Sequence, residues 1–218
     1  MNMLVQNWED LAPAERAALL QRPAVADDTR IREATSALIT EVRDRGDAAL
    51  RELTARFDGV TVDNLRVDED EVAAAEAALD ARQLAAIDLA IANLRRFPEA
   101  QRPDPIRVET MPGFVCERVS HPLDAVGIYV PAGTAPLPSA AIMLAVPAVI
   151  AGCPTRILCT PPRSDGTADP AVVVAARRGG VEKIFKVGGA QAVAAMAYGT
   201  QTIPKVNKIF GPGNAWVT

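Results

Sequence analysis

The chain has 218 residues, 49% of them hydrophobic and 23% charged, a balance that excludes wholesale disorder and is typical of a globular protein. Its net charge of −4 disfavours nucleic acid as a partner, and its single histidine excludes a multi-histidine metal site made by this chain alone. Three cysteines without Cys-x-x-Cys spacing indicate reduced thiols and a cytoplasmic location.

The hydropathy pattern argues against a membrane. The N-terminal sequence becomes polar and acidic too early for a signal peptide. The longest apolar run, residues 140–151, contains Pro147 and is too short to span a bilayer. We therefore expect no membrane association and interpret this run as a buried helix.

Apolar residues with helical spacing dominate residues 1–104, which we expect to form a helical amino-terminal region. The first clear helix carries an apolar stripe from Ile31 to Val42 and is capped by Asp27 or Asp28. Such a stripe indicates packing in a core and carries no chemistry.

Three more helices are expected in this region. Asp47 is expected to cap one that ends at the Asp-Gly pair 58–59, and an acidic first turn at 68–71 begins another. The last carries apolar residues over 84–94 and is expected to stop before Pro98, because proline lacks the N–H that a helix interior needs.

A stretch rich in proline and polar residues, 99–113, marks an expected boundary. We predict a helical region over 1–104 and a Rossmann-like α/β domain over 105–218. Alternation over 114–119 predicts a strand antiparallel to one that starts at Ile106.

The second half alternates short apolar runs with helix-length segments, a pattern that predicts right-handed crossovers and a parallel sheet with flanking helices. One helix is expected to have Asp169 as its cap and Pro170 at its first position, and a later one to span Ala192 to Tyr198. The four predicted parallel strands cover residues 125–130, 156–160, 182–187 and 206–210.

Three of these strands end in turns suited to a ligand. Tyr129 precedes the sequence PAGTAPLP, and the later strands run into GGAQ (188–191) and GPGN (211–214). Glycines let a ligand approach the backbone, and the free N–H groups of a following helix favour phosphate. Because ligands of parallel sheets bind at the carboxyl ends of the strands, this pattern favours a nucleotide or another anionic cofactor.

The pattern is not the usual dinucleotide fingerprint. No Gly-x-Gly-x-x-Gly occurs, and no aspartate or glutamate follows Gly189, so the acid that commonly binds ribose is missing. His121 is interpreted as a surface or strand-end residue, and Cys153 and Cys159 as core residues. The residues alone therefore predict an α/β domain with a nucleotide-type ligand and no complete catalytic set.

Charge is unevenly distributed along the chain. Residues 1–104 carry 21 acidic and 13 basic side chains, whereas all four lysines lie beyond residue 182. From charge alone, we favour the explanation that the protein has two differently solvated faces. A more specific alternative is an anionic ligand near the carboxyl-terminal half.

Several of these motifs together resemble the histidinol dehydrogenase family, and the resemblance covers essentially the whole chain. The segments that carry it are VGIYVPAGTAPLPS (126–139), AVPAVIAGC (145–153), KVGGAQAVAAMAYGT (186–200) and PKVNKIFGPGNAWVT (204–218), with RGDAAL (45–50) and FDGV (57–60) in the first half.

The resemblance implies an oxidoreductase that converts L-histidinol to L-histidine in two NAD-dependent steps, with zinc bound at each site of a homodimer. It also implies that Tyr129, Gln191 and Asn214 contact NAD. If these residues had structural roles alone, Tyr129 would be a tyrosine at the edge of the core, Gln191 a glutamine at a helix start and Asn214 an asparagine N-cap.

Members of this family are about twice as long, and the resemblance places their catalytic and zinc-binding residues in the later segments. We therefore expect this chain to be an amino-terminal fragment that lacks catalytic residues, binds no zinc and is inactive alone. Two alternatives stay open: a related NAD-dependent dehydrogenase of another small alcohol, and a noncatalytic nucleotide-binding or dimerisation module.

Overall fold

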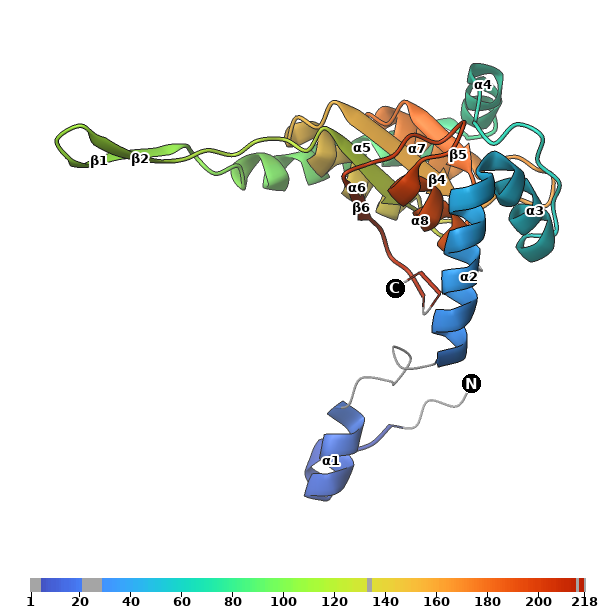
Figure 1. The fold of residues 1–218 in the computed structure, drawn as a ribbon, viewed down its shortest axis with the longest axis horizontal. Helices are drawn as coiled ribbons and strands as arrows, with labels where there is room; N and C mark the ends of the chain where they lie inside the picture. The colour runs from blue at the N-terminus through green and yellow to red at the C-terminus, as the bar shows by residue number, and fades with distance from the viewer. Residues whose placement is uncertain (1–4, 21–28, 133–134, 215, 218) are drawn as a thin grey trace.

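A parallel sheet of four strands forms the centre of the protein (Figure 1). The computed structural model describes residues 5–20, 29–132, 135–214 and 216–217. Within these residues the strand order is β5-β4-β3-β6, and all three pairings are parallel. The predicted α/β class is therefore confirmed. The strands are β3 (Ala125–Tyr129), β4 (Thr155–Thr160), β5 (Lys183–Lys186) and β6 (Lys208–Phe210).

The register brings the carboxyl ends of β3, β4 and β5 to one edge. Tyr129 pairs with Cys159, and Cys159 pairs with Phe185. On β3 and β4 the last four residues of each strand are buried, as expected for strands covered on both faces. Whatever follows these strands in the chain therefore emerges at a shared edge.

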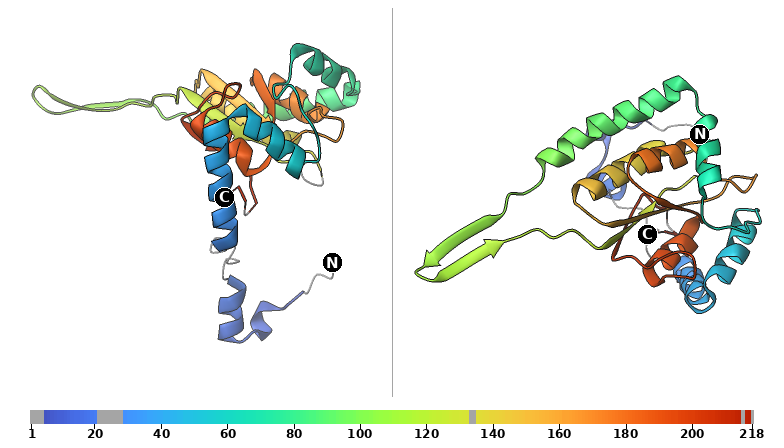
Figure 2. Two further views of the ribbon diagram at one scale, coloured as in Figure 1. Left: turned by 45° about the vertical axis from the view of Figure 1, so that its right-hand side comes forward. Right: turned by 90° about the horizontal axis from the view of Figure 1, so that it is seen from above.

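Helices cover both faces of the sheet (Figures 1 and 2). One face packs on α4 (Glu69–Ala77), α5 (Ala81–Ala100), α6 (Pro138–Ile150) and α7 (Pro170–Arg178) through a core that includes Ile128, Leu158 and Ile184. The other packs on α2 (Thr29–Arg45), α3 (Asp47–Phe57) and α8 (Gly189–Tyr198) through a core that includes Ile157, Cys159 and Phe185.

The helices of the first half thus share their cores with the sheet. Leu50 and Leu53 of α3 lie in the core on the α8 side, whereas Ala75 of α4 and Ile87 of α5 lie in the core on the other side. The predicted division between 1–104 and 105–218 stays a prediction. Residues on both sides of it share the two cores.

Side-chain caps explain where several helices begin. Asp68 accepts a hydrogen bond from the N–H of Glu71 at 2.8 Å, and Asp80 forms a capping box with Gln83. Asp169 caps α7 with Pro170 in its first turn, as predicted. The predicted caps Asp27 and Asp28 lie outside the described residues.

Three local predictions are wrong at the ends of helices. Helix α5 continues through Pro98, because proline in the last turn costs a single bond there and Gln101 closes the helix with short-range bonds. Helix α8 begins at Gly189 instead of Ala192, so Gln191 lies in its first turn.

Asp47, the third of these, does not cap α3, because the preceding Gly46 is the N-cap. The Asp47 backbone N–H donates to the side chain of Gln201 at 2.8 Å, and its carboxylate accepts from the backbone N–H of Thr202 at 3.2 Å and from the hydroxyl of Thr202. This buried carboxylate ties α3 to the loop after α8, a contact that no local pattern reveals.

A two-stranded hairpin connects α5 to the sheet and extends away from it (Figure 1). Strands β1 (Ile106–Met111) and β2 (Phe114–Arg118) pair antiparallel, which confirms the strands expected in this segment. Every residue of both strands is exposed.

The amino-terminal elements η1 (Trp8–Asp10) and α1 (Pro13–Leu20) bury none of their residues. Arg16 joins them, because its guanidinium donates to the carbonyl oxygens of Trp8 and Glu9, each at 3.0 Å. Among the helices of the described ranges, none is long and apolar enough to cross a membrane.

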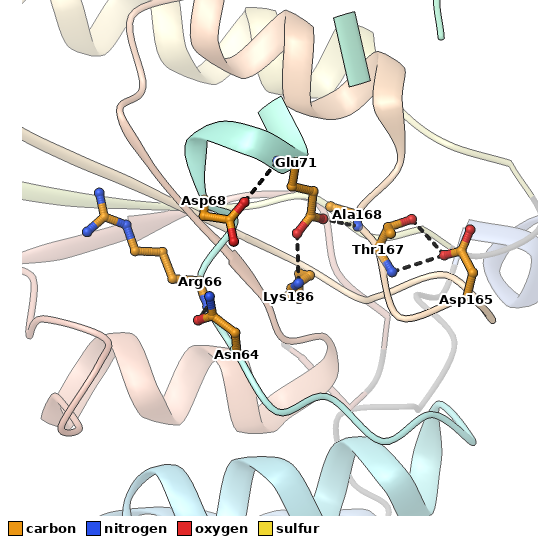
Figure 3. Close-up of polar contacts among 8 residues, drawn as sticks. All are labelled: Asn64, Arg66, Asp68, Glu71, Asp165, Thr167, Ala168 and Lys186. Atoms are coloured by element: carbon orange, nitrogen blue, oxygen red, sulfur yellow. Dashed lines mark hydrogen bonds and ion pairs between the residues drawn. The ribbon is translucent and has the colours of Figure 1, made fainter. Parts of the chain in front are cut away.

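An ion pair fastens the end of β5 to α4 (Figure 3). Lys186 Nζ lies 2.7 Å from one carboxylate oxygen of Glu71, and the other oxygen accepts from the N–H of Ala168 at 2.8 Å. The two charged side chains are 9% and 14% exposed. Because both charges are buried, removing one of them would leave the other without a counter-charge and would destabilise the fold.

We expect Lys186→Met to lower the free energy of unfolding by about 3–5 kcal/mol, because it leaves the Glu71 carboxylate buried without a cation. The double variant Lys186→Met/Glu71→Gln should recover most of this loss, since glutamine is neutral and still accepts from Ala168. Urea denaturation of the chain measures both.

Glu69→Gln is the matched control. Glu69 lies on α4 like Glu71, and its carboxylate pairs with Arg177 of α7 while it is itself largely exposed, so the variant removes a glutamate charge from a solvated ion pair. It should change the free energy of unfolding by less than about 1 kcal/mol. A double variant no more stable than Lys186→Met would contradict this account of the buried pair.

Candidate functional site

A cavity of about 530 Å³ lies at the carboxyl edge of the sheet, on the face covered by α2, α3 and α8. Its walls come from several separate parts of the chain. They are α2 (Ala34, Thr35, Ala37, Leu38, Glu41), the end of α3 (Leu53, Arg56, Phe57, Asp58), the sheet and the start of α8 (Tyr129, Gly189, Ala190, Gln191), and the segment after β6 (Asn214, Trp216, Val217).

Tyr129 is the last residue of β3 and is 5% exposed. Its hydroxyl oxygen accepts a hydrogen bond from the backbone N–H of Gly189 at 2.9 Å, which ties the end of β3 to the start of α8. Burial raises the pKa of the Tyr129 phenol, and the negative charge of nearby Asp58 raises this pKa further. The neutral phenol is therefore the form that the cavity holds.

Gln191 lies in the first turn of α8 and is 3% exposed. No side chain caps this helix, and Gly189 has a positive φ of 61°. A Cβ at position 189 would lie 2.7 Å from the Gln191 side-chain oxygen, so glycine leaves the room in which this amide sits. Within the described part of the chain, the amide has no hydrogen-bond partner.

Asn214 reaches the same cavity from the turn after β6. Its side-chain oxygen accepts from the N–H of Trp216 at 3.0 Å, and its carbonyl accepts from the N–H of Val217 at 2.9 Å. Gly211 brings this turn against β3, because a Cβ there would lie 2.2 Å from the carbonyl oxygen of Tyr129. The missing side chain thus serves a close approach of two chain segments.

All three residues proposed from the sequence therefore line one cavity. Two of them also have structural roles, because the Tyr129 hydroxyl accepts a hydrogen bond from the start of α8 and the Asn214 side chain closes a turn. Their contact with a cofactor stays a prediction. Gln191 has no such second role, because its side-chain amide has no hydrogen-bond partner among the described residues.

Sequence reasoning missed the wall supplied by α2 and α3. Thr35 Oγ1 and one carboxylate oxygen of Asp58 are buried and have no hydrogen-bond partner among the described residues. Burial raises the pKa of Asp58. The one available signal was the FDGV turn at 57–60, which carries the family resemblance but no chemistry of its own.

The remaining reactive side chains lie elsewhere. Cys153 and Cys159 are buried core residues, as expected, and burial raises the pKa of the Cys159 thiol far above its usual range. None of the four lysines lines the cavity. In the described ranges, no three His, Cys, Asp or Glu side chains lie close enough together to hold a metal ion.

This architecture defines the class of the protein: an α/β protein whose ligand cavity lies at the carboxyl edge of a parallel sheet. A family model described as histidinol dehydrogenase matches residues 20–218. The chain belongs to the histidinol dehydrogenase family.

Similar proteins agree with this assignment. The chain is 53% identical over 216 residues to histidinol dehydrogenase of Xanthomonas euvesicatoria, which covers 99% of this chain and 50% of that protein. It is 54% identical over 218 residues to that of Xanthomonas campestris, with 100% and 50% covered. The chain spans about half the length of these relatives.

A crystal structure of histidinol dehydrogenase from Elizabethkingia anophelis has the same fold over this part. It superposes with a TM-score of 0.88 at 38% identity and covers 95% of this chain and 48% of that one. The agreement extends over nearly all of the chain, so it includes the first-half helices that wall the cavity.

We expect the phenol of Tyr129 to ionise above its usual pH range, because burial disfavours the phenolate. Stability contributed by the neutral phenol is present below the unfolded-state pKa and is lost as the pH rises through the raised folded-state pKa. Ultraviolet titration of phenolate absorbance measures this, and Tyr129→Phe should remove the part of the change that occurs above the usual range.

Tyr198→Phe is the control, since Tyr198 is 49% exposed and does not line the cavity. It should leave that late absorbance change in place. A titration curve that Tyr129→Phe leaves unaltered would contradict the buried, neutral phenol.

Proposed function

We propose that this chain binds NAD in the cavity and that the protein oxidises L-histidinol to L-histidine, as part of histidine biosynthesis. One observation carries the proposal: Tyr129, Gln191 and Asn214 come from three separate strand ends and line a single cavity in a chain of this family. Relatives named histidinol dehydrogenase support the substrate and the pathway.

The cavity has the size and the groups that a nucleotide cofactor requires. Its volume lies within the roughly 300–1,000 Å³ of typical ligand pockets. Helix α8 points an N-terminus without a side-chain cap at it, which favours phosphate oxygens. The buried amide of Gln191 offers both donors and an acceptor to ribose or to a carboxamide.

Two NAD molecules would be needed in turn, one to accept the hydride of the alcohol carbon and a second to accept the hydride of the hydrated aldehyde. The residues described here hold and orient the cofactor and keep water from its buried side. Tyr129 supports this indirectly, because its hydroxyl fixes the first backbone N–H of α8.

The proposal assigns proton transfer and zinc binding to the part of the family sequence that these 218 residues do not span. The described side chains do not fit a zinc site, so no step of the reaction is assigned to a metal here. We propose accordingly that the chain by itself turns over no substrate.

We also propose that the protein forms a homodimer. The exposed hairpin supports this, because it carries several large apolar side chains, and exposed apolar patches mark contact surfaces. These side chains are Ile106, Val108, Met111, Phe114 and Val115.

We expect Gln191→Ala to weaken NAD binding by about 1 kcal/mol, or roughly fivefold in Kd, because the variant loses a hydrogen bond to the cofactor. Trp216 lines the cavity and provides a fluorescence signal for the titration. The measurement is made in a Trp8→Phe background, which leaves Trp216 as the single tryptophan of the chain.

Gln101→Ala is the matched control, because Gln101 is exposed just after α5 and does not line the cavity. It should leave the Kd for NAD unchanged. An equal Kd in Gln191→Ala and Gln101→Ala would assign Gln191 to the structure instead of the cofactor.

A further inference from the structure

The sequence leaves one requirement of a dinucleotide site unmet. Such sites usually place an acid about 20 residues after the glycine-rich turn, where its carboxylate binds the ribose hydroxyls. No aspartate or glutamate follows Gly189 in this chain. Within these 218 residues, a carboxylate that binds ribose would therefore come from a segment before Gly189.

Among the described residues that line the cavity, Glu41 and Asp58 carry carboxylates, and they differ in their partners. Glu41 of α2 is engaged, because it pairs with Arg45 at 2.7 Å one helical turn away. Asp58 follows α3 and forms no ion pair within the described ranges, and one of its oxygens is buried without a hydrogen-bond partner. Asp58 is therefore the carboxylate that the cavity leaves unsatisfied.

A second group in the same wall is unsatisfied as well. Thr35 Oγ1 of α2 is buried without a partner in the described part of the chain, and it comes from a different helix. Buried polar atoms without partners are rare, because each costs free energy of desolvation. Thr54 and Thr160 also have such atoms but do not line the cavity. Thr35 and Asp58, by contrast, line it together with the amide of Gln191, a set of groups that suits a ligand with several hydroxyl groups.

We propose that Asp58 binds a ribose of the dinucleotide through its hydroxyls and thereby selects NAD over NADP. The proposal rests on the proposed function, since it assigns a new contact to the same cavity. Ribose hydroxyls are donors and satisfy the carboxylate, whereas the 2′-phosphate of NADP would bring negative charge against it.

Arg56 is the competing feature of the wall. An arginine near the ribose accommodates a 2′-phosphate in NADP-dependent sites. Its guanidinium here lies over the Phe57 ring, 5.1 Å from the ring centroid, and this stacking holds its charge against an aromatic face. The unpaired carboxylate of Asp58 therefore decides the preference for the cofactor.

The test compares Kd values for NAD and NADP by calorimetry in the 218-residue chain. We expect the chain to bind NAD at least tenfold more tightly than NADP. Asp58→Asn should weaken NAD binding about tenfold, the loss of a hydrogen bond to a charged acceptor, while NADP binding stays equal or improves. Asp58→Ala should lose NAD affinity to a similar degree.

Asp70→Asn is the matched control, because it removes the same charge from an exposed position on α4 that does not line the cavity. It should leave both Kd values unchanged. The isosteric Asp58→Asn should fold normally, because the side chain has no hydrogen-bond partner in the described chain and the backbone bond from Asp58 to Thr54 is kept. Thermal melting checks this.

Two failures are distinguishable. If Gln191→Ala weakens NAD binding but Asp58→Asn changes neither the Kd for NAD nor the NAD-to-NADP ratio, the role of Asp58 is refuted and the proposed function stands. If the unaltered chain binds neither dinucleotide, the proposed function is overturned, and the assignment of Asp58 falls with it. Tighter binding of NADP than NAD would assign the ribose contact to Arg56.

Discussion

A parallel sheet has no face that it can leave in water, and this constraint shapes the whole chain. In the described residues, the second half supplies the four strands of this sheet and three helices, α6, α7 and α8. The helices before residue 105 complete the cover, α4 and α5 on one face and α2 and α3 on the other. The sheet and the early helices are therefore one unit of packing.

The same cover creates the candidate site. Parallel strands end at a common edge, where backbone groups and the turns that follow them come together. Helices α2 and α3 rise beside this edge and close one side of the space above Tyr129. The helices that cover this face thus bring Thr35 and Asp58 into the lining of the cavity, and each of these residues has a buried polar atom without a hydrogen-bond partner among the described residues.

The two faces of the sheet differ in whether buried charges near the carboxyl edge are paired. On the α4 face, Lys186 and Glu71 satisfy each other, and the pair holds the end of β5 just before the turn at Gly188 (Figure 3). On the α3 face, the carboxylate of Asp58 pairs with no cation in the part of the chain that the structure describes, and burial raises its pKa. Unsatisfied groups of this kind are expected at functional sites, so the contrast with the satisfied Lys186–Glu71 pair supports the binding role proposed for Asp58.

Features that depend on residues close together along the chain could be predicted from the sequence. Apolar periodicity identified the strands and most helices, and glycine-rich strand ends located Tyr129, Gln191 and Asn214 at one edge, because a parallel sheet leaves its strand ends no other place. Tertiary structure decided what depends on distant partners. Asp47 bonds to a loop more than 150 residues away instead of capping its helix, and Asp58 enters the cavity only because α3 packs beside α8. Local spacing contains no information about such contacts, since they exist only once separate segments bury a common core.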